Sequence, residues 1–218
     1  MNPKKSTFRY AVVLDFEATC QEGPRIRPQE IIEFTSVLVD VKSGEVIDEF
    51  ESFVRPQSHA VLSDFCTELT STQQVQVDGA PFFEDVWQEH QAWLDDHGLN
   101  QTNAMLCTCG DWDLQLMLPA QLKLLQPTPN TPTFYTSWCN LKRLYSDVTN
   151  EKAKGMSGML RRFGLPLLGH HHRGIDDCRN LAHLLQVLLE KGAELRETAS
   201  LESGRRGHAE QAARKKPR

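Results

Sequence analysis

Residues 11–20 read A-V-V-L-D-F-E-A-T-C, an apolar run that ends in two carboxylates, Asp15 and Glu17. The run predicts a buried strand over residues 8–16. Residues two apart in a strand face the same way, so both acids project together while Phe16 turns to the opposite face. Buried acids are costly unless they are paired or bound to a cation. The pattern leaves two alternatives open, a solvent-facing pair at a strand end or one wall of a metal site.

The segments that follow predict an α/β fold with a mixed sheet flanked by helices. Strands are expected over 30–40 and 46–54, joined by the turn K-S-G-E, so the fold opens with an antiparallel meander. A short buried strand is expected at 104–109. Helical spacing and end signals predict helices within 62–76 and over 81–96, 119–126, 138–147, 155–163 and 175–191. Strands first and helices afterwards are typical of such a domain.

Length and charge restrict the classes of function. The 218 residues carry a net charge of −5, but residues 201–218 hold six Lys/Arg against two acids. An acidic body argues against broad electrostatic binding of nucleic acid, yet it is compatible with a small site bridged by cations. We expect a short extension over 1–7, one domain over 8–195 and a disordered basic tail over 196–218. The tail is either a solvated end or a nucleic-acid arm or targeting signal.

The chain has no signal-peptide core and no apolar stretch of about 20 residues, so we expect no membrane association. An intracellular location follows, cytoplasmic first, with the nucleus as the alternative. The six cysteines form no C-x-x-C pair, and we expect reduced thiols rather than a zinc site.

Two further acidic segments lie where a strand is expected to meet a helix. D-W-D occupies 111–113, and G-H-H-H-R-G-I-D-D occupies 169–177. Asp111 or Asp176 alone is explained equally well as a helix cap, and the histidines as a surface run. Taken together, hard oxygen ligands favour Mg²⁺ or Mn²⁺ over zinc.

In this order the motifs resemble the DEDDh family of 3′→5′ exonucleases, which have a ribonuclease H-like fold. The similarity is greatest to the branch of the histone-mRNA 3′-end exonuclease and its relatives in small-RNA turnover, and it covers most of residues 8–193. The matching segments are D-F-E-A-T-C, E-I-I-E-F, F-V-R-P, L-S-D-F-C-T-E-L-T, C-G-D-W-D-L, W-C-N-L-K and H-R-G-I-D-D-C-R-N.

The resemblance places the metal ligands on Asp15, Glu17, Asp113 and Asp177. The family's second aspartate follows an aromatic residue, which selects Asp113 after Trp112 rather than Asp111. Its last motif is a histidine, four residues and an aspartate. His172 with Asp177 satisfies that spacing, and so does His171 with Asp176. Because the pair in relatives ends on the second aspartate of D-D, we expect His172 and Asp177.

The resemblance implies hydrolysis with two Mg²⁺ or Mn²⁺ ions, which such sites hold about 3.5–4 Å apart. Asp15 is expected to bridge both ions, with Glu17 and Asp177 completing one position and Asp113 the other. His172 would accept the proton of the attacking water. The product would be a nucleoside 5′-monophosphate.

The implied substrate is a single-stranded 3′ end of RNA, bound through Glu17, the backbone of Ala18 and His172. Phe16 and Trp112 are expected either to support the terminal base or to be core residues. A contact with the 2′-hydroxyl would favour RNA, with single-stranded DNA as an alternative substrate. A non-catalytic RNA- or protein-binding module is the rival class.

Two expectations concern the choice of RNA 3′ ends and the role of Asn180. Since seven residues precede the first strand, we expect trimming of generic 3′ ends rather than recognition of one stem-loop. Asn180, one helical turn after Asp177, is expected to be a helix-surface amide, with orientation of Asp177 as the alternative.

Overall fold

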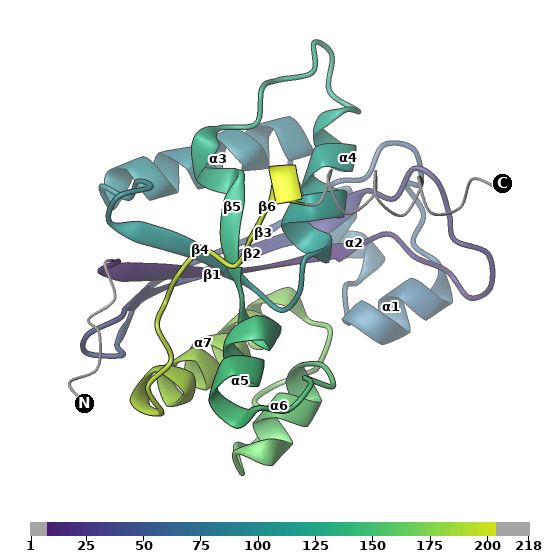
Figure 1. Cartoon of the computed structure of the whole chain (residues 1–218). Coiled ribbons are helices and arrows are strands. Elements are labelled where there is room, and N and C mark those ends of the chain that lie inside the picture. The colour runs from purple at the N-terminus through teal and green to yellow at the C-terminus, as the bar shows by residue number, and fades with distance from the viewer. Residues whose placement is uncertain (1–7, 204–218) are drawn as a thin grey trace, which may run out of the picture.

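The computed structural model describes residues 8–203, which form a six-stranded mixed sheet (Figure 1). The predicted extension over 1–7 and residues 204–218 of the tail predicted over 196–218 lie outside the described residues. The strands are β1 (Tyr10–Ala18), β2 (Ile31–Asp40), β3 (Val46–Phe53), β4 (Ala104–Thr108), β5 (Ser137–Asn140) and β6 (Ala199–Ser200), in the spatial order β3-β2-β1-β4-β5-β6.

The predicted antiparallel meander is confirmed. β1 pairs antiparallel with β2, and β2 with β3, while β1 and β4 run parallel, as do β4 and β5. β1 is therefore a central strand, hydrogen-bonded on both edges. Its carboxyl end, where Asp15 and Glu17 lie, extends beyond the pairing with β4, which ends at Val13, and is paired with β2. Carboxyl ends of strands in α/β sheets are common positions for ligand sites.

Helices cover both faces of the sheet. They are α1 (Asp64–Thr70), α2 (Gln74–Asp78), α3 (Phe83–Asp96), the π-helical turn η1 (Asp113–Met117), α4 (Leu118–Leu122), the 3₁₀ turn η2 (Thr133–Tyr135), α5 (Leu141–Thr149), α6 (Met156–Arg162) and α7 (Gly174–Glu190). Figure 1 shows α3 and α4 on one side of the sheet and α5, α6 and α7 on the other. The sheet is thus the middle of three layers.

The alternation of β1 supplies one core on each face. Val12, Leu14 and Phe16 belong to the cluster that includes α3 and α4 residues. Ala11 and Val13 belong to the cluster with α5, α6 and α7 residues. By the same period of two, Asp15 and Glu17 lie on the α7 side of the sheet.

Two boundaries differ from the sequence predictions. The helix predicted over 138–147 begins only at Leu141, because Trp138, Cys139 and Asn140 form β5 and Cys139 pairs with Cys107 of β4. The predicted end of the domain at residue 195 falls short of β6, which pairs with β5 through Ala199 and Trp138. A four-residue and a two-residue strand are too short to show a period in the sequence.

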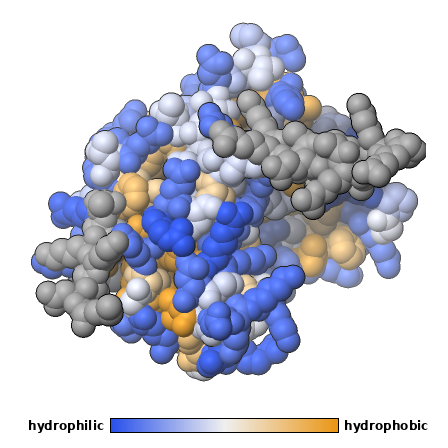
Figure 2. Space-filling view, viewed as in Figure 1, coloured by the Kyte–Doolittle hydropathy of each residue, from blue (hydrophilic) through white to orange (hydrophobic). Residues whose placement is uncertain are grey.

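Charged and polar side chains cover much of the visible surface (Figure 2). Over residues 8–203, no helix combines the length and the apolar character that a membrane crossing requires. All six cysteines are free thiols.

Candidate active site

A pocket of about 380 Å³ opens at the carboxyl end of β1, between η1, the α5–α6 loop and the start of α7. Its size falls in the range of small-ligand sites. Every residue that the sequence assigned to a catalytic, metal or substrate role lines it. These are Asp15, Phe16, Glu17, Ala18, Trp112, Asp113, His172 and Asp177; the lining also includes His171 and Lys142.

The two β1 acids face a third acid from α7. Carboxylate oxygens of Asp15, Glu17 and Asp177 lie within 4.8 Å of one another. Burial raises the pKa of Asp15 well above its usual range, and the charges of Asp113 and Glu17 raise it further. Burial, followed by the charges of Asp177 and Glu33, raises the pKa of Glu17 to about 9. These carboxylates are therefore crowded and short of positive partners.

The structure separates Asp113 from Asp111. Asp113 begins η1, and its Oδ1 accepts the backbone N–H of Phe16 at 3.2 Å, which fixes this carboxylate beside β1. Burial raises its pKa to about 6. Asp111 instead accepts hydrogen bonds from Trp138 Nε1 at 3.0 Å and Asn140 Nδ2 at 2.9 Å, away from the pocket. Asp111 lies in the bend before η1, whereas Asp113 is its first residue, so the two carboxylates occupy different sites.

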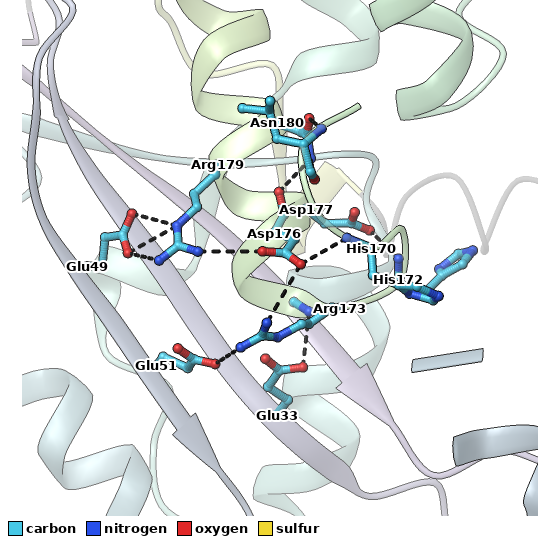
Figure 3. Close-up of polar contacts among 12 residues, drawn as sticks. Glu33, Glu49, Glu51, His170, His172, Arg173, Asp176, Asp177, Arg179 and Asn180 are labelled. Carbon is cyan, nitrogen blue, oxygen red and sulfur yellow. Dashed lines mark hydrogen bonds and ion pairs between the residues drawn. The ribbon is translucent and has the colours of Figure 1, made fainter. Parts of the chain in front are cut away.

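Asp176 and Asp177 are divided in the same way. Asp177 lines the pocket, and burial raises its pKa. Asp176 points to the other side of α7, where its Oδ2 accepts the backbone N–H of His170 at 2.9 Å and its carboxylate contacts Arg173 and Arg179 (Figure 3). Only Asp177 of this pair can serve as a ligand in the pocket.

Both candidate histidines, His171 and His172, line the pocket. Nδ1 of His171 is 3.0 Å from Oδ2 of Asp177, and the two imidazole rings stack with centroids 3.9 Å apart. The backbone N–H of His172 donates to the same Asp177 oxygen at 3.1 Å, with a left-handed φ of 69°. The ring nitrogens of His172 have no hydrogen-bond partner within residues 8–203. Burial and the neighbouring His171 lower the pKa of His172, which favours the neutral ring.

Asn180 holds the histidine loop, so its interpretation as a helix-surface amide is wrong. The residue is 1% exposed. Its Oδ1 accepts the N–H of Leu168 at 2.9 Å, and its Nδ2 donates to the carbonyl of Leu168 at 2.8 Å and to that of Asp176 at 2.7 Å (Figure 3). Asn180 therefore fixes the segment that leads into the histidines rather than the Asp177 carboxylate.

Replacement of Asn180 by alanine is expected to lower the free energy of unfolding by about 1–3 kcal/mol. The substitution leaves the polar backbone groups of Leu168 without their partner. Urea unfolding followed by circular dichroism measures the change. Glu190→Ala, an exposed change at the end of the same helix, is expected to stay within about 0.5 kcal/mol of the wild type. A loss of unfolding free energy no larger than that of the control would show that Asn180 does not stabilise the segment leading into the histidines.

Glu33 is a buried acid to which the sequence analysis gave no role, although it belongs to the motif E-I-I-E-F. It faces Glu17 across the β1–β2 pair and is fully buried. Its Oε2 accepts the N–H of Gly174, the first residue of α7, at 3.0 Å, while its Oε1 has no hydrogen-bond partner. Burial raises its pKa to about 7. An acid inside an otherwise apolar strand was the available signal.

Gly174 allows this close approach. A Cβ atom at residue 174 would lie 2.8 Å from Oγ1 of Thr35 and 3.2 Å from Cδ of Glu33. The first turn of α7, which carries Asp177, therefore packs directly on β2. This contact fixes Asp177 relative to Asp15 and Glu17.

The donor set fits divalent cations. Four carboxylates converge in one pocket, and burial raises the pKa of each of them, with the charges of neighbouring acids adding to the shift at Asp15 and Glu17. Hard oxygen ligands suit Mg²⁺ and Mn²⁺, and a bound cation would offset the repulsion between Asp15, Glu17 and their neighbouring acids. Asp15, Glu17 and Asp177 would hold a cation, and Asp113 lines the same pocket.

Glu17→Gln is expected to change how the stability of the metal-free protein depends on pH. The folded pKa of Glu17, about 9, exceeds its ordinary value of 4.5, so the folded state binds more protons between those values. Wild-type stability therefore falls as the pH rises through this window, by at most about 1.4 kcal/mol per pH unit for this proton. Glutamine removes this contribution, so the stability of the variant rises relative to that of the wild type from pH 5 to pH 9.

Thermal unfolding in EDTA at pH 5, 7 and 9 measures the difference between the two proteins. Subtracting the melting temperature of one protein from that of the other removes the titration of groups that the charge of Glu17 does not affect. A difference in melting temperature that stays constant across this range would contradict the raised pKa of Glu17.

The predicted base-contacting residues differ in burial. Phe16 is 3% exposed, and its ring packs edge-on against Phe34 with centroids 4.7 Å apart. This burial favours the core alternative for Phe16, although it also borders the pocket. Trp112 is partly exposed, packs against the core cluster and borders both this pocket and its neighbour, so its role beside a base stays a prediction.

Comparison with known proteins places this geometry in a family. The family model RNase_T, described as Exonuclease, matches residues 12–185. ERI1 exoribonuclease 3 of Homo sapiens is 38% identical over 196 residues, which is 88% of this chain and 57% of that protein. The chain thus spans little more than half the length of this relative. The 3′-5′ exonuclease eri1 of Schizosaccharomyces pombe is 33% identical, over 88% of this chain and 72% of that protein.

Comparison with solved structures supports the same family. The nuclease domain of 3′hExo, a DEDDh family member bound to rAMP, superposes with a TM-score of 0.85 at 33% identity, over 90% of this chain and 100% of that one. Cell-death related nuclease 4 superposes with a TM-score of 0.82 at 26% identity, over 88% of this chain and 67% of that one. These similarities confirm the ribonuclease H-like fold. The chain therefore belongs to the exonuclease family RNase_T, in its ERI1-type DEDDh branch.

Proposed function

We propose that this protein is a 3′→5′ exoribonuclease that removes nucleoside 5′-monophosphates from single-stranded RNA with two Mg²⁺ or Mn²⁺ ions. The observation that carries the proposal is the convergence of Asp15, Glu17, Asp113 and Asp177 with a histidine in one pocket. A binding module would not need four crowded, poorly compensated acids. The chain also belongs to a family whose relatives include ERI1 exoribonuclease 3 and the 3′-5′ exonuclease eri1.

Each residue has a distinct role in the proposal. The four carboxylates hold the cations, which when bound supply an activated water and stabilise the charge that develops at phosphorus and on the leaving oxygen. His172 accepts a proton from the attacking water, since its lowered pKa keeps the ring neutral near pH 7. His171, whose Nδ1 lies against Asp177, orients that carboxylate. Glu17 and the Ala18 backbone contact the terminal ribose.

RNA is the proposed substrate for two reasons. Glu17 and Ala18 line the pocket, and their proposed contact with the terminal ribose would include the 2′-hydroxyl, which distinguishes RNA from DNA. A related solved structure concerns recognition of a histone mRNA stem-loop by a 3′-exonuclease, at 32% identity and a TM-score of 0.85. For this chain we propose generic single-stranded 3′ ends.

A labelled-strand assay tests the proposal. Single-stranded RNA and DNA 20-mers of one sequence, labelled at the 5′ end, are incubated with Mg²⁺ or Mn²⁺. We expect a descending ladder from RNA and slower shortening of DNA. A matched RNA that ends in a 3′-phosphate is expected to resist. Absence of shortening with either metal would overturn the enzymatic proposal, and faster DNA degradation would reassign the substrate.

A further inference from the structure

A cluster of basic side chains lies beside the candidate active site. A second pocket, of about 400 Å³, is bordered by Lys152, Lys154, Arg161 and Arg162 together with one acid, Glu151. The surface over α6, at the lower right of Figure 2, is strongly hydrophilic. Residues 150–163 hold four Lys/Arg and one acid in a chain whose net charge is −5. This surface is therefore locally positive on an acidic protein.

Three of these cations are free to bind an anion. Arg162 is paired, because its Nε lies 3.2 Å from Oε1 of Glu151. Lys152, Lys154 and Arg161 are exposed and have no ion-pair partner within residues 8–203. Several other arginines of the described chain are neutralised by acids, namely Arg143, Arg173, Arg179 and Arg196. We call Lys152, Lys154 and Arg161 the basic patch.

The basic patch adjoins the active-site pocket through one short segment. Gly155 and Met156 border the active-site pocket, whereas Lys154 and Ser157 border the basic pocket. The segment is thus a shared wall between the two. Lys142, on the preceding helix α5, lies in the active-site lining and adds a cation on the same side.

We infer that the basic patch carries the RNA strand on the 5′ side of the terminal nucleotide. The inference rests on the proposed function. A strand whose 3′ nucleotide occupies the acidic pocket needs cations for the phosphates that follow it, and positively charged grooves track single strands in this way. The basic patch is a place next to the pocket where unpaired cations gather.

A second route away from the pocket is less suited to phosphates. A neighbouring pocket shares Gln29 and Trp112 with the active site and includes Arg25 and Arg27. The rest of its lining is apolar: Ile26, Pro28, Leu116, Met117 and Ala120. Such a lining suits a base rather than a charged backbone. We therefore place the phosphates on the basic patch.

The test removes the charge of the basic patch by the triple change Lys152→Gln, Lys154→Gln and Arg161→Gln. For a 20-mer RNA we expect KM to rise about tenfold with kcat unchanged. The slope of log affinity against log salt is expected to fall by about 2, from three lost contacts at roughly 0.7 each. A dinucleotide carries only the scissile phosphate, so its KM is expected to stay the same.

A matched control removes equal charge at the opposite end of β1 and α7, through Arg9→Gln, Lys42→Gln and Lys191→Gln. It is expected to leave the KM for the 20-mer within about twofold of the wild type. The double change Arg25→Gln and Arg27→Gln tests the second route.

Three results would overturn the inference. The first is an unchanged KM and salt slope in the basic-patch variant, and the second is an equal rise in KM for the dinucleotide. The third is a rise in the KM for the 20-mer in the Arg25/Arg27 variant alone. Fluorescence anisotropy with the 20-mer in EDTA measures binding without hydrolysis. If the wild type fails to hydrolyse RNA, the proposed function fails, while the anisotropy still decides the role of the basic patch.

Discussion

Asp15→Asn is expected to lower kcat on single-stranded RNA by about 10³-fold or more. Carboxylate oxygens of Asp15, Glu17 and Asp177 lie within 4.8 Å of one another. After burial, the charges of four acids raise the pKa of Asp15, namely Asp113, Glu17, Asp177 and Glu33. Loss of its charge removes the ligand common to both proposed cation positions. Cations at such sites stabilise several kcal/mol of transition-state charge, and each 1.36 kcal/mol corresponds to about a tenfold change in rate.

Asparagine keeps the size of the side chain and removes one crowded negative charge, so the metal-free variant is expected to fold at least as stably as the wild type. Loss of activity would then reflect the site rather than unfolding, which thermal denaturation in EDTA checks. Asp96→Asn, an exposed change at the end of α3, serves as a matched control and is expected to leave kcat unchanged. Wild-type kcat in the Asp15 variant would exclude the proposed role of Asp15.

The second large effect concerns the two stacked histidines. His172→Ala is expected to lower kcat by about 10²- to 10⁴-fold, the usual contribution of a general base. His171→Ala is expected to lose less than about tenfold, since His171 acts on Asp177 by orientation. Single-turnover rates on the RNA 20-mer measure both changes.

A general base gives two further signatures that a structural residue does not. The pH–rate profile of His172→Ala should lose its lower limb, because neutralisation of the imidazole no longer limits the rate. Added imidazole should restore part of the activity of this variant and not that of Asp15→Asn. Loss of activity in His171→Ala together with a wild-type rate in His172→Ala would reverse the assignment of the two histidines.

Long elements and the acidic positions were predictable from the sequence because they follow strong local patterns. The apolar run of β1, the branched residues of β2 and the helical spacing of α7 indicated these elements within a few residues of their observed bounds. The resemblance then selected Asp113 and Asp177, and the structure brings both to the pocket while Asp111 and Asp176 turn away.

Features defined by distant contacts were not predictable in this way. β5 is a strand because Cys139 pairs with Cys107, which no local pattern shows. Asn180 reads as a polar position on an amphipathic helix, but its partner Leu168 lies 12 residues away in a loop. Glu33 lies within the motif E-I-I-E-F, yet its contact with Gly174 joins residues 141 positions apart. Each of these contacts exists only once the chain has folded.

Direct measurement of Mn²⁺ binding tests the central claim, that the four carboxylates form a two-cation site. Mn²⁺ is titrated calorimetrically into the metal-free wild type in the presence of AMP, and into Asp15→Asn and Asp96→Asn under the same conditions. We expect the wild type and Asp96→Asn to bind two equivalents of Mn²⁺, and Asp15→Asn to lose high-affinity binding. Equal Mn²⁺ binding by Asp15→Asn and the wild type would contradict that claim.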